Sequence, residues 1–159
     1  MTTEETKALA RIESTTDPAA LRQIAINARG KSENVEREAL RRLATVSATH
    51  APGTVGHDCW AMVHAVEELR RLNGRKVSRM NRMRPKIERE GEIAALEYCA
   101  LNQTEGFSEV MNYGMPELTA EAIVLRHRDH FSQAAIAAAR ARLTAAGVQI
   151  DDLGNIVLT

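Results

Sequence analysis

The stretch HDCWAMVHAVEELRRLNG, residues 57–74, indicates the fold class of this chain. Its apolar residues recur every three or four positions, the spacing that places side chains on one face of an α-helix. The stretch closes on Asn73-Gly74, a pair typical of a helix C-terminus. We therefore predict a helix over about 58–73. Its apolar face consists of Cys59, Met62, Val63, Val66, Leu69 and Leu72.

Helix-capping residues divide the rest of the chain into further short helices. Asp17-Pro18 is typical of a helix start, and Gly30 is typical of the end of the same helix. Such signals predict an all-α fold, a compact bundle of seven or eight short helices. The other starts and stops stand at Ser32, Gly91, Thr104, Gly114, Thr119, Ser132 and Gly147.

Both ends of the chain depart from this pattern. Residues 1–16 are polar and rich in Thr, so we expect a flexible segment there and a single helical domain over 17–159. Over about 148–158, alternating apolar residues flank the turn sequence DDLGN, which predicts a small C-terminal β-hairpin. An isolated hairpin is marginally stable in water. We therefore expect it to pack on the helices or to pair with a second copy in a homodimer.

Composition narrows the class of protein. The only two cysteines lie forty positions apart without a CxxC partner, and no apolar signal-peptide core follows Met1. We therefore expect a soluble cytoplasmic protein of bacterial type. No apolar run approaches the roughly 18 residues needed to cross a bilayer, so no membrane partner is expected.

Positive charge is concentrated in residues 70–89, which we call the basic segment. It holds nine of the 21 Lys and Arg residues and a single acid, so its net charge is +8, whereas the other 139 residues carry −8. Such an uneven distribution of charge bears on what the protein binds rather than on how it folds, and it indicates an anionic partner. The nine cations are Arg70, Arg71, Arg75, Lys76, Arg79, Arg82, Arg84, Lys86 and Arg89.

Helical spacing would arrange many of these cations into one surface. An α-helix advances about 100° per residue, so on a helical wheel that starts at Arg75 five cations fall within about 80° of arc, with an apolar docking flank opposite. The five cations are Arg75, Arg79, Arg82, Lys86 and Arg89. Pro85 leaves two versions open, because proline inside a helix removes a hydrogen-bond donor and clashes with the preceding turn. The helix is either kinked or divided into a basic turn over 78–84 and a helix that begins at Pro85.

A helix over about 58–73, a turn containing Gly74 and a basic helix over 77–90 form the outline of a helix-turn-helix unit. The second helix of such a unit enters the major groove of DNA, where Arg pairs with guanine and Asn with adenine. Neighbouring cations contact phosphates. The predicted base contacts are Ser78, Arg79, Asn81 and Arg82, and the other predicted nucleic-acid-binding residues are Arg70, Arg71, Arg75, Lys76, Lys86 and Arg89.

We therefore predict a nucleic-acid-binding protein, with DNA favoured over RNA, that has no catalytic activity and needs no cofactor. Two alternatives stay open. The basic segment could serve an adaptor or inhibitor that contacts an acidic protein, or its arginines could pair with acidic helices of the same chain. Binding to a membrane surface is disfavoured because the apolar flank of the basic helix lacks an aromatic anchor.

Residues with catalytic or metal-binding chemistry are sparse. His127, Asp129 and His130 would form part of a zinc site only if a further ligand approached them, so we predict no metal site. The chain contains no Gly-rich phosphate loop and no nucleophile motif. Cys59 and Cys99 fall on predicted apolar helix faces, where a buried and inert thiol is expected.

Overall fold

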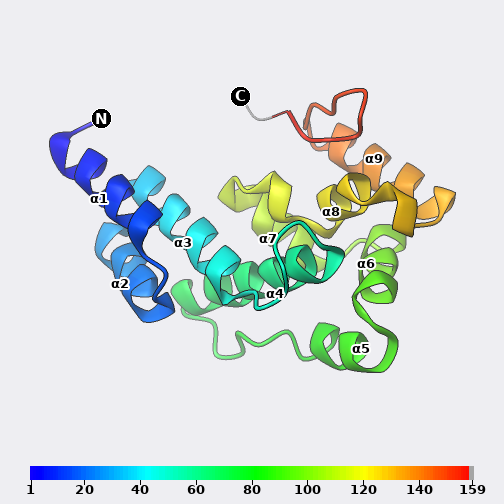
Figure 1. Cartoon of the computed structure of the whole chain (residues 1–159), viewed down its shortest axis with the longest axis horizontal. Helices are drawn as coiled ribbons and strands as arrows, with labels where there is room; N and C mark the ends of the chain where they lie inside the picture. Colours follow the sequence, from blue (N-terminus) through cyan, green and yellow to red (C-terminus); the bar gives the residue numbers. More distant parts are fainter. Residues whose placement is uncertain (158–159) are drawn as a thin grey trace.

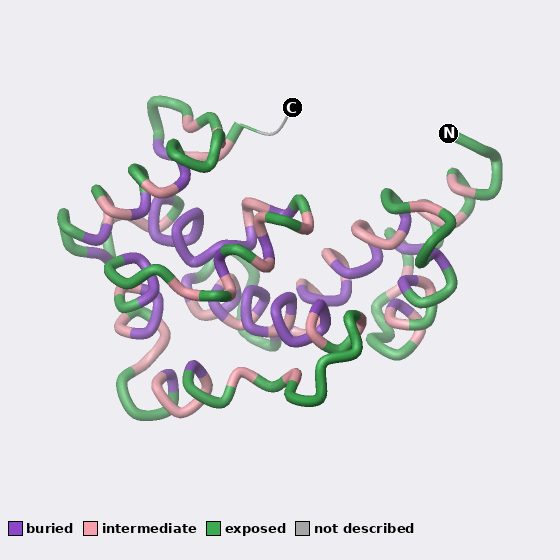
Figure 2. Tube along the Cα trace, turned by 180° about the vertical axis from the view of Figure 1, so that it is seen from behind, coloured by how far each residue is buried: buried purple, intermediate pink, exposed green. Residues whose placement is uncertain are grey.

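Helix α4 (Val55–Leu72) runs through the middle of the molecule, with other helices on both sides of it (Figure 1). This arrangement comes from a computed structural model, which describes residues 1–157. The long apolar stretch quoted above forms this helix, and most of its residues are buried, as Figure 2 shows. The helix predicted over about 58–73 is therefore present and central.

The described residues form nine α-helices and two short 3-10 helices, so the all-α prediction is confirmed while the predicted number of helices is too low. The other α-helices are α1 (Thr3–Ser14), α2 (Pro18–Ala28), α3 (Glu33–Ser47), α5 (Met83–Glu90), α6 (Glu92–Leu101), α7 (Glu105–Tyr113), α8 (Ala120–Arg126) and α9 (Gln133–Ala145). The 3-10 helices are η1 (Pro116–Leu118) and η2 (Arg128–His130). Part of the difference is α1, which lies within the segment predicted to be flexible. That flexibility stays a prediction.

Side-chain caps begin several of these helices, as the sequence indicates. The carboxylate of Asp17 accepts the N–H of Ala19 at the start of α2, with Pro18 in the first turn. Ser32 and Ser132 cap α3 and α9 in the same way. These hydrogen bonds satisfy donors that the first turn of a helix leaves without partners, so they set where each helix begins.

Two hydrophobic clusters share α4 between them. One contains apolar residues of α1, α2 and α3 together with Ala65 and Leu69 of α4. The other contains apolar residues of α5, α6, α8 and α9 together with Cys59, Met62 and Val63 of α4. Because α4 contributes to both clusters, it fixes the N-terminal helices and the C-terminal helices relative to each other.

The helix predicted over 77–90 is wrong in its first half. Residues 73–82, which we call the connecting segment, form no helix, and α5 begins only at Met83. Pro85 disfavours a longer helix, since its ring would clash with the carbonyl group four residues earlier if the helix extended further back. A division at the proline, the second version left open above, is nearer to the structure than a kinked helix. The stripe of five cations on one helix face does not form.

The helix-turn-helix pair predicted over 58–73 and 77–90 is also wrong. A helix-turn-helix unit joins its helices through a turn of three or four residues, whereas ten residues, 73–82, separate α4 from α5. Figure 1 shows this chain passing along one edge of the molecule before α5. No recognition helix follows directly on α4, so the major-groove geometry expected from the sequence is absent from the described chain.

The predicted C-terminal β-hairpin is wrong over the described residues 148–157, and Leu158 lies outside them. Within that range a single antiparallel bridge joins Ile150 and Ile156, without strands on either side. The carboxylate of Asp151 accepts the N–H groups of Leu153 and Asn155, both at 2.9 Å, and this closes a compact turn in place of extended strands. Ile150 and Ile156 pack against the helical core, whereas pairing with a second copy stays a prediction.

Candidate binding cleft

Five of the nine cations of the basic segment form ion pairs within the chain. Arg70 makes a bidentate pair, because its Nε and Nη2 atoms donate to the carboxylate of Glu109 at 2.7–3.1 Å. The N···O distances of the other pairs are 2.6 Å for Arg71–Glu68, 2.9 Å for Arg75–Glu105, 2.6 Å for Arg84–Glu67 and 2.9 Å for Lys86–Glu90. Pairing with carboxylates of the same chain, the alternative left open above, therefore accounts for just over half of the cations in the basic segment.

Glu67 fixes the path of the connecting segment. It is buried on α4, and its Oε2 atom accepts the backbone N–H of Met80 at 2.8 Å and Nε of Arg84 at 2.7 Å. Burial by itself would raise the pKa of this carboxyl group, but the hydrogen bonds from Arg84 and Met80 and the charge of Arg84 hold that pKa below its ordinary value. The end of the connecting segment is therefore tied to α4 by an ionised carboxylate.

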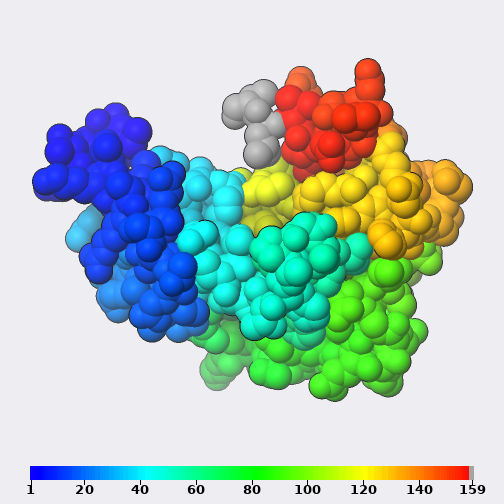
Figure 3. Space-filling model, in the orientation of Figure 1, coloured from blue at the N-terminus to red at the C-terminus, as the bar shows by residue number. Residues whose placement is uncertain are grey.

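Four cations of the basic segment have no carboxylate within ion-pair distance among residues 1–157, and we call them the unpaired cations. All four side chains belong to exposed residues. Three stand on the connecting segment and one near the end of α5. They are Lys76, Arg79, Arg82 and Arg89. Uncompensated positive charge is thus confined to residues 76–89 of the basic segment. Figure 3 shows this part of the chain, in green, along one edge of the molecule.

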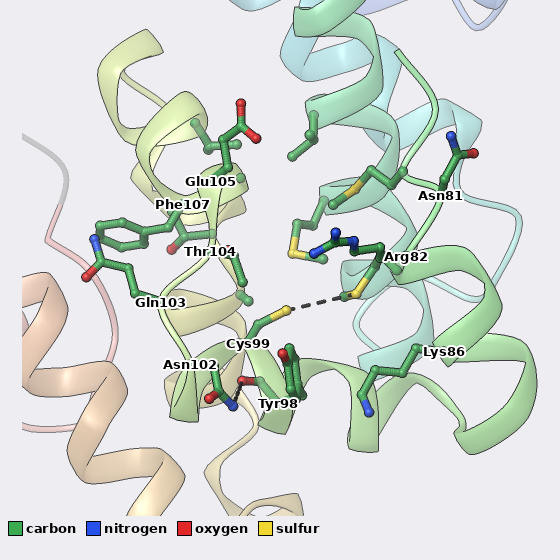
Figure 4. A pocket seen from close by; sticks show the side chains of 18 of the residues that line it. Asn81, Arg82, Lys86, Tyr98, Cys99, Asn102, Gln103, Thr104, Glu105 and Phe107 are labelled. Atoms are coloured by element: carbon green, nitrogen blue, oxygen red, sulfur yellow. Dashed lines mark hydrogen bonds between the residues drawn. The ribbon is translucent and has the colours of Figure 1, made fainter. Parts of the chain in front are cut away.

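Three of the unpaired cations, Arg79, Arg82 and Arg89, line a cleft of about 770 Å³. The connecting segment and α5 form one wall of this cleft. The end of α6, the loop over 102–104 and the start of α7 form the other wall. Figure 4 shows the guanidinium group of Arg82 extending toward the space between the two walls, whereas the amide of Asn81 points away from it. The cleft therefore carries exposed positive charge at its edge.

The floor of the cleft is apolar. It includes Met62 and Val66 of α4, Met83 of α5, and Phe107 and Val110 of α7, all of which are buried. Tyr98 lies at the mouth with 49% of its surface exposed, and Nζ of Lys86 lies 4.7 Å from the centre of its ring. An apolar floor with cations at the edge of the cleft suits a ligand that is itself amphipathic.

The acidic residues that line the cleft are already paired. Glu105 accepts from Arg75, and the fully buried Glu121 accepts from Arg142. Burial raises the pKa of Glu121 despite that contact. Neither carboxylate lies within ion-pair distance of the unpaired cations, so the positive charge at the edge of the cleft is not neutralised from inside.

The structure brings together six of the ten residues predicted to bind nucleic acid, since all six line the cleft. These are Arg70, Arg79, Asn81, Arg82, Lys86 and Arg89. Arg71, Arg75, Lys76 and Ser78 do not line it. Sequence reasoning missed the opposite wall, including Tyr98, Gly106 and the loop over 102–104, because no local pattern indicates which part of the chain will face residues 79–89.

The residues considered for catalysis or metal binding lie elsewhere or are occupied. Nε2 of His127 lies 2.7 Å from Oδ2 of Asp58, while Asp129 and His130 are exposed. Within the part of the chain that the structure describes, no three His, Cys, Asp or Glu side chains are placed to hold a metal ion. Cys99 borders the cleft, but burial raises the pKa of its thiol to about 12, which keeps it protonated at neutral pH.

Comparison of the chain with protein-family models, with curated proteins and with solved structures finds no significant match in any of the three. Among residues 1–157, no helix combines the length and the apolar character that crossing a membrane requires. The properties of the cleft are therefore the basis for assigning a function.

Proposed function

We propose that this protein binds single-stranded nucleic acid, DNA in the first instance, and does so without catalysing a reaction. One observation carries the proposal: the unpaired cations are exposed, and three of them line one wall of a single cleft. The other cations of the basic segment are neutralised by carboxylates of the same chain. Phosphate groups would complete the charge balance at the unpaired positions.

A single strand fits this surface better than a duplex. Recognition of a duplex commonly relies on a helix in the major groove, and Arg79 and Arg82 stand on an irregular segment instead. Single-strand binding combines cations that follow the backbone with aromatic side chains on which bases stack. The half-exposed ring of Tyr98, at the mouth of the cleft, supplies such a side chain.

The salt dependence of binding measures how many cations take part. Each neutralised phosphate of a single strand contributes roughly −0.7 to the slope of log K against log salt concentration. Contacts from the four unpaired cations predict a slope of about −3, whereas contacts from all nine cations would give about −6. Fluorescence anisotropy of a labelled oligothymidylate at several salt concentrations measures this slope, and a matching duplex serves for comparison.

A charge-matched pair of variants tests the site. The test variant replaces all four unpaired cations by Gln, at Lys76, Arg79, Arg82 and Arg89. The control variant replaces four exposed cations elsewhere by Gln, at Lys7, Arg11, Lys31 and Arg140. We expect the test variant to lose binding to the single strand and the control to retain most of it. Equal affinity of the two variants, or no binding by the wild type at low salt, contradicts the proposal.

A second candidate function is binding to an acidic protein. It is favoured by the exposed apolar surface of Val77 and Tyr98 beside the unpaired cations, with 57% and 49% exposed. An acidic segment with apolar side chains would contact both. Under this alternative the wild type binds no oligonucleotide, and an acidic protein co-purifies with it until Arg79, Arg82 and Arg89 are replaced by Glu.

A further inference from the structure

We propose that the cleft also binds a small amphipathic anion, namely a free single-chain carboxylate. Its apolar tail would lie in the cleft against the exposed side chains of Val77 and Tyr98, and its carboxylate would contact Arg82. This inference goes beyond nucleic-acid binding, because it concerns the interior of the cleft and requires no nucleic acid.

The size and the floor of the cleft suit an apolar tail. Its volume of about 770 Å³ lies within the roughly 300–1,000 Å³ of most small-molecule sites. Met62, Met83 and Val66 of the floor are each no more than 6% exposed. The apolar surface open to a ligand therefore belongs mainly to Val77 and Tyr98, which also line the cleft and are 57% and 49% exposed. Methionine side chains are flexible and adapt to ligands of irregular shape. A flexible chain therefore has apolar side chains to contact in the cleft without a large rearrangement of the core.

Arg82 is the side chain best placed to bind the anionic head. Its guanidinium group extends toward the cleft (Figure 4), and no carboxylate among the described residues pairs with it. A guanidinium group presents two parallel N–H donors that match the two oxygens of a carboxylate. Glu105 and Glu121, the acids that line the cleft, are occupied by Arg75 and Arg142.

Neither half of such a ligand suffices alone. Inorganic phosphate would contact Arg82 but leave Val77 and Tyr98 exposed, and an uncharged alcohol would cover these apolar side chains but leave Arg82 without a partner. A carboxylate with an attached chain satisfies both, so we expect affinity to depend on the charge and on the chain length together.

Calorimetric titration of the full chain with hexanoate, octanoate and decanoate tests this dependence, at concentrations below those at which the compounds form micelles and without nucleic acid. Affinity should rise about fourfold for each added methylene group. Decanol should bind about tenfold more weakly than decanoate. Affinity that does not change with chain length, or equal binding of decanol, overturns the proposal. Binding to phosphatidylglycerol vesicles without binding of decanoate also overturns it.

Gly106 offers a matched pair of variants that change only the space in the cleft. It lies in the first turn of α7, and a Cβ atom there would lie 3.6 Å from Val66 Cγ2 and 3.9 Å from Met80 Cε. Gly106→Ala therefore fits at ordinary contact distances, whereas the longer side chain of Gly106→Leu extends into the cleft. We expect decanoate binding to persist in Gly106→Ala and to be lost in Gly106→Leu. Equal binding by both folded variants contradicts the proposal.

Arg82→Gln tests the head group independently of the floor, and it keeps the proposal testable if Gly106→Leu does not fold. Arg82 is exposed, so its replacement leaves the core unchanged. We expect about tenfold weaker binding of decanoate and unchanged binding of decanol. Arg140→Gln, on the exposed face of α9, is the matched control and should bind decanoate as the wild type does. Equal decanoate affinity in Arg82→Gln and Arg140→Gln overturns the assignment of Arg82.

Discussion

The carboxylate of Glu67 on α4 accepts two hydrogen bonds from Arg84 on α5, at 2.6 and 2.7 Å. Seventeen positions separate the two residues, and the connecting segment lies between them. The ion pair therefore closes a loop that contains the connecting segment, and this segment forms part of one wall of the cleft. It also ties the start of α5 to α4 without the short turn that a helix-turn-helix unit would use.

Glu67→Gln should lower the free energy of unfolding by about 1.5–3 kcal/mol, since a buried hydrogen bond to a charged group contributes that much. Glutamine keeps an oxygen that can accept the N–H of Met80, so the change mainly removes the negative charge opposite Arg84. Urea denaturation of this variant, beside the exposed control Glu88→Gln, measures the difference. Equal stability of the two variants would show that the pair does not stabilise the fold.

Acid should destabilise the protein partly through Asp58. Burial by itself raises the pKa of its carboxyl group, but the hydrogen bond from His127, the charge of Arg126 and the contact with His57 lower that pKa below the ordinary value of 3.8. When the pKa of a carboxyl group is lower in the folded protein than in the unfolded chain, the ionised group stabilises the fold. This stabilisation is complete above the pKa of the unfolded chain, and it is lost as the pH falls through the pKa of the folded protein. Asp58→Asn should therefore cost about 1–2 kcal/mol at pH 7 and little at low pH.

Urea denaturation at several pH values between 7 and 3 checks the role of Asp58. The exposed Asp129→Asn variant, two residues from His127, is the control and should follow the wild type. A difference between Asp58→Asn and the wild type that stays constant down to pH 3 argues against the expected titration.

Tyr98→Ala should weaken binding to an oligonucleotide at least fivefold, because stacking of a base on an aromatic ring contributes about 1–3 kcal/mol. Tyr98→Phe keeps the ring and should bind like the wild type. Anisotropy titrations at one salt concentration compare the three proteins. If Tyr98→Phe loses as much affinity as Tyr98→Ala, stacking is not the source of the effect.

Gly154→Ala should destabilise the C-terminal turn. Gly154 has a φ of +85°, and a Cβ atom there would lie only 1.8 Å from Nη2 of Arg128. Gly30 has a similar φ of +79°, and apart from its chain neighbours no heavy atom of residues 1–157 lies within 4 Å of a Cβ atom placed there, so Gly30→Ala measures backbone strain alone. We expect a cost of about 1 kcal/mol at Gly30 and a larger cost at Gly154. Thermal denaturation compares the two, and equal costs would mean that Arg128 moves aside freely.

The elements that the sequence predicts well are those set by local hydrogen bonds and local spacing. Asp17, Ser32 and Ser132 begin helices as expected, because a capping side chain bonds to a backbone donor two or three residues away. The helix over 58–73 follows equally from its apolar spacing. Six of the predicted binding residues also lie together, since they are neighbours along the chain.

The start of α5 could not be predicted from the residues around it. Pro85 allows either a kinked or a divided helix, and both are compatible with the residues around it. The backbone N–H of Met80 instead bonds to the carboxylate of Glu67, thirteen positions earlier in the chain. That contact favours the irregular path of the connecting segment, and only the packed structure contains it.

The sequence by itself determined that the chain is helical and that its positive charge is concentrated in residues 70–89, because both follow from the order of the residues. The tertiary structure decided which of those charges remain available. Arg70 meets Glu109 across 39 positions of sequence and Arg75 meets Glu105 across 30, while Arg79 and Arg82 meet no carboxylate among the described residues. Ion pairing acts over a few ångströms of space, so the fold selects which cations can bind a partner.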